Sequence, residues 1–153
     1  MQRSKPPFRA DHVGSLLRTA SLKDAREKRK NNQISADALR EIEDREIEQV
    51  IKKQEAAGLH SVTDGEYRRI SWNYDFMENL HNVESYLSAR PLQFAATGPQ
   101  PRPILLRVIG KLGGYTPHPM IEHFKFRKAH TRQTPKLTIP SPTSLHFRYG
   151  RDA

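Results

Sequence analysis

Residues 54–66 read QEAAGLHSVTDGE, and they decide the fold class that this sequence predicts. The pattern is typical of a helix end, a glycine stop and a short strand, followed by Asp64 and Glu66 on either side of a glycine. In parallel α/β folds, ligands bind at the carboxyl ends of the strands, where these two carboxylates lie. A similar segment, DHVGS, occupies residues 11–15. We therefore expect two polar strand ends to form two walls of one pocket.

The helix that precedes this strand is the clearest element in the sequence. Ser35 is a good N-cap, apolar residues recur at helical spacing over residues 36–57, and Gly58 suits the left-handed position after a helix. Glu43 falls with other charged residues on the side expected to face solvent. Further along the chain the pattern predicts strands at 8–15, 59–66, 104–112 and 137–139, helices within 16–34 and over 119–130, and a proline-rich irregular excursion at 84–103. This alternation indicates an α/β fold with a parallel sheet or barrel.

Composition sets the broad class of protein. The chain has 153 residues, enough for one domain, but its mean hydropathy of −0.80 is polar for a compact globule. The formal net charge is +9, and residues 81–153 carry +8 of it. A basic half raises the possibility of a nucleic-acid partner. The basic residues form no dense run and no helical stripe, so we favour compensating acidic residues in a partner or in sequence outside this chain.

Several classes of structure are excluded or disfavoured by the sequence. There is no cysteine, which excludes disulfides and any cysteine-based zinc site within these residues. Residues 1–7 have no apolar core of the kind found in secretory signals. No apolar run approaches the ~20 residues needed to span a bilayer. We expect a cytoplasmic protein with no membrane partner.

Asp64 and Glu66 are the strongest candidates for chemistry. Residues two apart on a strand point to one face, so the pair could bind an ammonium group or act as acid and base. Alternatively, one carboxylate pairs with Arg68 or Arg69. Ser15 offers a hydroxyl and an amide to a polar ligand, but the local sequence favours a plain turn with Ser15 as a helix N-cap.

Other candidate patterns are weaker. The aromatic stretch 71–77 could close over a flat ligand, or it could form the apolar side of a helix. His118 and His123 are five residues apart and so do not share a helix face, which favours ordinary surface residues over a metal site. Glycine-rich phosphate-binding loops and the Gly-x-Ser-x-Gly nucleophile motif are absent from the sequence.

Three segments, taken in order, resemble a known family. They are FRADHVGSLLR at residues 8–18, QEAAGL with VTDGEYRR at 54–59 and 62–69, and KLTIPSPT with LHFR at 136–143 and 145–148. This ordered set resembles the cobalamin-independent methionine synthases, specifically the single-domain proteins similar to the synthase's C-terminal catalytic barrel. The resemblance covers nearly the whole chain.

The resemblance implies a (β/α)8 barrel that binds zinc and transfers a methyl group from a methyltetrahydrofolate to homocysteine or a similar thiol, in methionine biosynthesis. It implies that Val13, Gly14 and Ser15 hold the amino-acid part of homocysteine, and that Glu66 meets the ammonium group. Asp64 is then a supporting neighbour, and His12 lies beside the site.

The sequence also departs from the family. A complete barrel of this type takes ~250 residues, whereas residues 1–153 end after the third barrel strand. The family's zinc ligands include cysteine and come from later strands. We therefore expect a truncated, incomplete (β/α)8 TIM-type barrel, the N-terminal part of a single domain, with no catalytic or metal-binding residue of its own. Such a chain is inactive alone unless another chain complements it. The alternative is a small basic nucleic-acid-binding protein.

Overall fold

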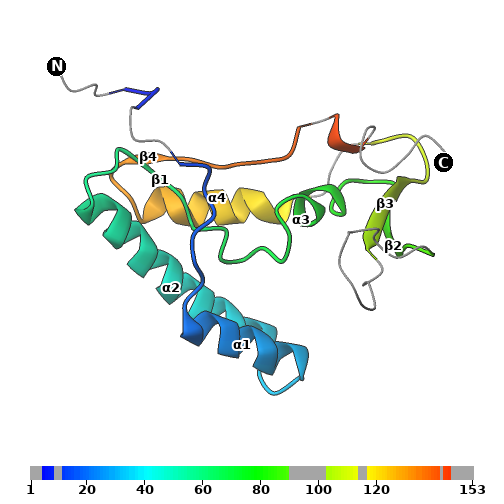
Figure 1. Cartoon of the computed structure of the whole chain (residues 1–153), viewed down its shortest axis with the longest axis horizontal. Helices are drawn as coiled ribbons and strands as arrows, with labels where there is room; N and C mark the ends of the chain where they lie inside the picture. Colours follow the sequence, from blue (N-terminus) through cyan, green and yellow to red (C-terminus); the bar gives the residue numbers. More distant parts are fainter. Residues whose placement is uncertain (1–4, 9–11, 90–102, 114–116, 142, 146–153) are drawn as a thin grey trace, which may run out of the picture. The chain divides into compact units, whose positions relative to one another are not determined.

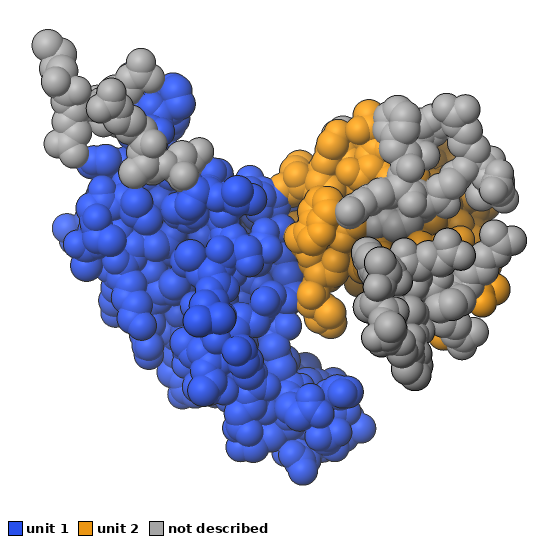
Figure 2. Space-filling view, in the orientation of Figure 1, with its two compact units in different colours: residues 1–69, 121–138 blue, residues 70–120, 139–153 orange. Residues whose placement is uncertain are grey.

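The computed structural model describes residues 5–8, 12–89, 103–113, 117–141 and 143–145 (Figure 1). The chain divides into two compact units, one of residues 1–69 with 121–138 and the other of residues 70–120 with 139–153 (Figure 2). Within the described ranges, no helix is long and apolar enough to cross a membrane.

The first unit is built on two helices, α1 (Ala20–Lys30) and α2 (Ala36–Ala56). Thr19 caps α1 by accepting the Leu22 N–H, and Ser35 caps α2 by accepting the Ala38 N–H at 3.0 Å. Gly58 follows α2 with φ +81°, as predicted. The two helices bury a cluster made of Leu22, Ile47, Val50, Ile51 and Tyr67, with Leu16 and Phe126 packed against it. The expected helices and the apolar face of α2 are therefore confirmed.

Two short parallel strands lie beside α4 (Pro119–Ala129) in Figure 1. Strand β1 (Ser61–Val62) pairs in parallel with β4 (Thr134–Pro135), with Ser61 opposite Thr134. Two further backbone bonds, Thr134 N–H to His60 and Lys136 N–H to Val62, extend the ladder. A parallel pair joined through a helix confirms the α/β class, while the barrel stays a prediction.

Three expected strands are corrected by the structure. Strand β1 covers only Ser61–Val62 of the expected 59–66, so Asp64 and Glu66 lie after the strand and not on one face of it. The third strand lies at 134–135 and not at 137–139. After Lys136 the backbone no longer pairs with β1 and bonds to side chains instead. The carbonyl of Thr138 accepts a bond from Arg69 Nη2 at 2.6 Å. The opening strand of residues 8–15 falls partly outside the described residues, and 12–15 are not in a strand.

The second unit contains α3 (Tyr74–Met77) and an antiparallel pair, β2 (Val83–Leu87) with β3 (Ile104–Val108). The excursion predicted at 84–103 is therefore partly a strand, because VESYL pairs with ILLRV, while residues 90–102 lie outside the description. The aromatic stretch forms one short helical turn with Met77 buried and Trp72 about half exposed.

His118 is buried, so the expectation of a surface residue was wrong. Its Nδ1 accepts the Met120 N–H at 3.2 Å, and its Nε2 lies 2.8 Å from the Phe76 carbonyl oxygen. The ring thereby caps the start of α4.

Candidate functional site

Glu66 lies at the centre of the site that the sequence predicts. Its side chain is buried, and its Oε1 accepts bonds from Arg69 Nη1 at 3.2 Å and from Thr138 Oγ1 at 3.0 Å. Its Oε2 has no partner among the described residues. The pairing with Arg69 bears out one alternative weighed from the sequence, but it leaves half of the carboxylate available to a ligand.

Gly14 lies beside Thr63 and Thr138, close to Glu66. Its carbonyl accepts a bond from Thr63 Oγ1 at 2.8 Å, and a side-chain carbon at Gly14 would lie 3.3 Å from Thr138 Oγ1. With φ +132°, this position has a backbone conformation that favours glycine. The opening segment, the end of β1 and the segment after β4 therefore converge, and Thr138 lies next to Gly14 and donates a hydrogen bond to Glu66.

The neighbours of Gly14 face away from the packed interior. Val13 is 80% exposed and Ser15 is also exposed. Leu16 N–H donates to the Gly65 carbonyl at 3.1 Å, which brings Ser15 next to the loop that carries Glu66. Over the described part of the chain, the N–H groups of Val13, Gly14 and Ser15 have no partner. Ser15 is not a helix N-cap, because Thr19 has that role.

Asp64 has a separate role from Glu66. Its Oδ1 accepts the backbone N–H of Glu66 at 3.0 Å, and its Oδ2 is 3.0 Å from Nη1 of Arg127 on α4. Arg127 and Thr138 are the two residues of this site that the sequence reasoning missed. Thr138 lay inside a quoted segment, but Arg127 has no local pattern that marks it.

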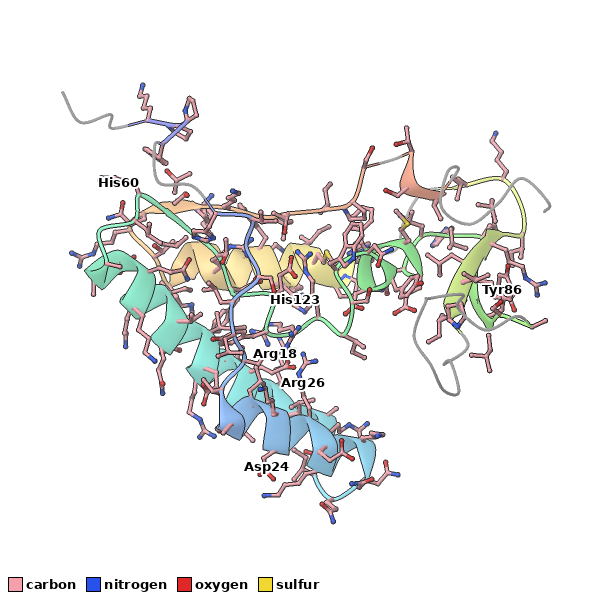
Figure 3. All side chains as sticks on the ribbon, viewed as in Figure 1. Arg18, Asp24, Arg26, His60, Tyr86 and His123 are labelled. Atoms are coloured by element: carbon pink, nitrogen blue, oxygen red, sulfur yellow. The ribbon has the colours of Figure 1, made fainter. Side chains whose placement is uncertain are left out.

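A network of arginines surrounds these carboxylates. Arg18 donates to the carbonyls of Glu66 and Arg69 at 3.0 and 2.7 Å, and Arg26 also donates to the Arg69 carbonyl. Arg18, Arg26 and His123 are labelled in Figure 3. These bonds fix the loop that follows Glu66.

Glu43 on α2 is buried between Arg26 and Arg68, at 3.3 and 3.5 Å, and not on the exposed polar face where the sequence placed it. The reason is that both arginines reach α2 from other segments. Burial raises the pKa of Glu43 despite the two guanidinium groups, which act in the opposite direction. Arg68 also contacts Asp44.

His123 on α4 is likewise partly buried, which was not expected. Burial lowers its pKa to about 4, and the nearby charge of Arg68 acts in the same direction, while Asp64 opposes it. The ring is therefore neutral at neutral pH.

Comparison with known proteins identifies the family. A family model described as the catalytic domain of cobalamin-independent synthases matches residues 8–90, more than half of the chain. The chain belongs to this family. At the family level this supports methyl transfer and methionine biosynthesis with small-molecule substrates, and it is consistent with a methyl-folate donor and zinc.

Individual relatives agree with this assignment. Two uncharacterized proteins of Bacillus subtilis strain 168, YxjH and YxjG, are 47% and 44% identical over 94% and 97% of this chain. A structure from Listeria monocytogenes, assigned as a vitamin-B12-independent methionine synthase, shares 44% identity and a TM-score of 0.75 over 93% of this chain. The chain spans only 37–39% of the length of these three proteins.

A more distant structure is similar in fold alone. It is a B12-independent methionine synthase from Shewanella sp. W3-18-1 in complex with selenomethionine, 19% identical, with a TM-score of 0.56 over 74% of this chain and 32% of its own. These comparisons give no support to the nucleic-acid alternative.

The described residues do not fit the family's zinc. No three histidine, cysteine, aspartate or glutamate side chains gather there in a group that could hold a metal ion. The sequence has no cysteine, and the carboxylate of Asp64 is taken by Arg127. No chemical step is therefore assigned to a metal held by these residues.

Proposed function

We propose that this chain contributes the homocysteine-binding part of a methionine-synthase-like S-methyltransferase, as the N-terminal part of an incomplete (β/α)8 barrel. The observation that carries the proposal is Glu66, a buried carboxylate held through one oxygen, beside the unpartnered N–H groups of residues 13–15. Family membership supports the same assignment.

The chemistry of the site suits both ends of an amino acid. An ammonium group binds well to a carboxylate oxygen that is already oriented, as Glu66 Oε2 is by the bonds to Oε1. An amino-acid carboxylate accepts bonds from backbone N–H groups and from a hydroxyl, which residues 13–15 offer. Val13 would contribute its backbone only, since its side chain points outward. The selenomethionine bound to the Shewanella protein is an amino acid of this kind.

In the family, zinc would supply the activation of the homocysteine thiol for methyl transfer, but no group of described residues in this chain would hold it. The residues of this chain would hold and orient the amino-acid end of that substrate. Because they do not fit a zinc site, we propose that the 153 residues alone have no methyltransferase activity. Methyl transfer to homocysteine by the purified chain would contradict this part of the proposal.

A complementing chain would supply the rest of the barrel. In its favour, the side chains of Val13, within the proposed site, and Leu17, beside it, are 80% and 85% exposed. We expect the natively produced protein to elute in an assembly larger than 17.6 kDa. Elution as a monomer of that mass would contradict the proposal of a complementing chain.

The binding proposal is tested by calorimetric titration of L-homocysteine and L-methionine into the chain. Wild type should bind both, and Glu66→Gln should weaken binding at least tenfold, because the ammonium loses its countercharge. Glu84→Gln is the matched control, since Glu84 also pairs with an arginine, Arg107, at an exposed position.

A second ligand isolates the ammonium contact. 4-(Methylthio)butanoate keeps the carboxylate and thioether of methionine but has no ammonium, so its affinity should not depend on Glu66. Equal losses for both ligands in Glu66→Gln, or no loss for either, would refute the role given to this residue.

A further inference from the structure

Arg127 is 1% exposed, and it reaches from α4 to the end of β1. Its Nη1 donates to Asp64 Oδ2 at 3.0 Å, and the guanidinium lies 5.1 Å from the centre of the Phe124 ring. Its Nε and Nη2 have no hydrogen-bond partner within the described residues. A buried cation with unpaired donors is poor for stability, which suggests that Arg127 has another role.

Asp64 links Arg127 to the backbone of Glu66. The Asp64 oxygen that is not bound to Arg127 accepts the Glu66 backbone N–H at 3.0 Å. Glu66 has φ +58°, a left-handed conformation that is unfavourable for a residue with a side chain. The bond to Asp64 holds the Glu66 backbone in this conformation, and this conformation determines where the carboxylate points.

The direction of the Glu66 carboxylate therefore depends on a correctly rotated Asp64. A guanidinium that pairs with a buried carboxylate fixes the rotation of that carboxylate. Arg127 provides this contact through its bond to Asp64 Oδ2. Arg69 and Thr138 complete the arrangement by binding Glu66 Oε1 directly.

We propose that Arg127 is a positioning residue for the amino-acid substrate, acting through Asp64 on the backbone of Glu66. This inference rests on the proposed function for its ligand, but not for its geometry. Arg127 itself does not touch the substrate.

The test compares Arg127→Met, Asp64→Asn and the double variant, with Arg107→Met as the control for loss of an exposed paired arginine. Each protein is titrated with L-methionine, and the Glu66 amide is followed by nuclear magnetic resonance. Arg127→Met should weaken binding about tenfold and shift the Glu66 amide proton upfield, because its carboxylate acceptor is lost or rotated. The affinity of the double variant for L-methionine should lie within threefold of that of Asp64→Asn, because both substitutions interrupt the same series of contacts to Glu66.

Independent, multiplying losses in the double variant would overturn the proposal, as would an unchanged Glu66 amide in Arg127→Met. Should Arg127→Met fail to fold, Arg127→Lys carries the test. A lysine keeps the charge but offers no planar pair of donors, so binding should weaken while the chain stays folded, and wild-type affinity with a wild-type Glu66 amide would refute positioning by the guanidinium. If wild type binds no amino acid, the proposed function fails, and the amide measurement still decides the role of Arg127.

Discussion

Gly65 offers the sharpest test of how the loop before Glu66 is built. It has φ +66°, and a side-chain carbon there would lie 2.7 Å from Cε1 and 2.9 Å from Cδ1 of Tyr67. The Tyr67 ring is buried in the core, and its hydroxyl donates to the Leu17 carbonyl at 2.9 Å. The ring therefore has little freedom to move aside, and Gly65→Ala should destabilise the chain.

Gly58 supplies a matched control. It has φ +81° but no atom within 4 Å of the added carbon. In both variants the left-handed conformation costs ~1–2 kcal/mol, partly offset by the lower entropy of the unfolded chain. Gly58→Ala should therefore cost ~1 kcal/mol. Overpacking against Tyr67 adds ~1–3 kcal/mol, so Gly65→Ala should cost ~3 kcal/mol.

The assay is urea denaturation followed by the circular dichroism of α1 and α2, with the denaturant dependence checked for constancy. In a Tyr67→Ala background, Gly65→Ala should cost no more than Gly58→Ala. Equal costs for the two glycine variants in the wild-type background would refute the close contact between residue 65 and the Tyr67 ring.

Three further predictions concern the first unit. Below its unfolded pKa of 6.5, His123 takes up a proton when the chain unfolds but not while it is folded, so it contributes stability above pH 6.5 that is lost as pH falls towards 4. The full difference in pKa corresponds to ~3 kcal/mol of stability, and solvent screening of the partly exposed ring reduces this to ~1–2 kcal/mol. Urea denaturation at pH values from 7 to 4 should therefore show this loss of unfolding free energy in wild type but not in His123→Gln. Ser35→Ala removes the α2 cap and should cost ~1 kcal/mol in urea denaturation, and a cost near zero would show that the cap is redundant. Gln54→Leu leaves both backbone groups of Thr63 unpaired and should cost ~2–4 kcal/mol by the same assay, whereas the exposed Gln49→Leu should change stability little.

The helices could be predicted because their signals are local. Ser35 and Gly58 lie at the two ends of α2, and each acts on backbone groups within a few residues. Burial of Glu43 could not be predicted in the same way, because its partners Arg26 and Arg68 are 17 and 25 positions away and reach it only after α1 and the β1 loop have packed. The third strand was placed too late for a similar reason, since its position depends on pairing with β1.

The candidate site shows the same division between local and distant information. The two carboxylates on either side of Gly65 could be found from the sequence, but their different roles could not. Asp64 becomes a structural residue because Arg127, 63 positions further on, pairs with it, and Glu66 remains available because Arg69 and Thr138 use only one of its oxygens. A left-handed Glu66 also has no sequence signature, because that conformation is usual only for glycine and asparagine.

These contacts explain why a binding site would need so much of the chain around it. Glu66 is fixed from three directions, by Asp64 at its backbone and by Arg69 and Thr138 at its carboxylate. Thr138 can reach it only because β4 pairs with β1, and Arg127 can reach Asp64 only because α4 leads into β4. A fragment that ended before β4 would keep Glu66 but lose the residues that orient it. We therefore expect amino-acid binding to require the segment through Thr138, although all of the ligand contacts proposed here lie before residue 67.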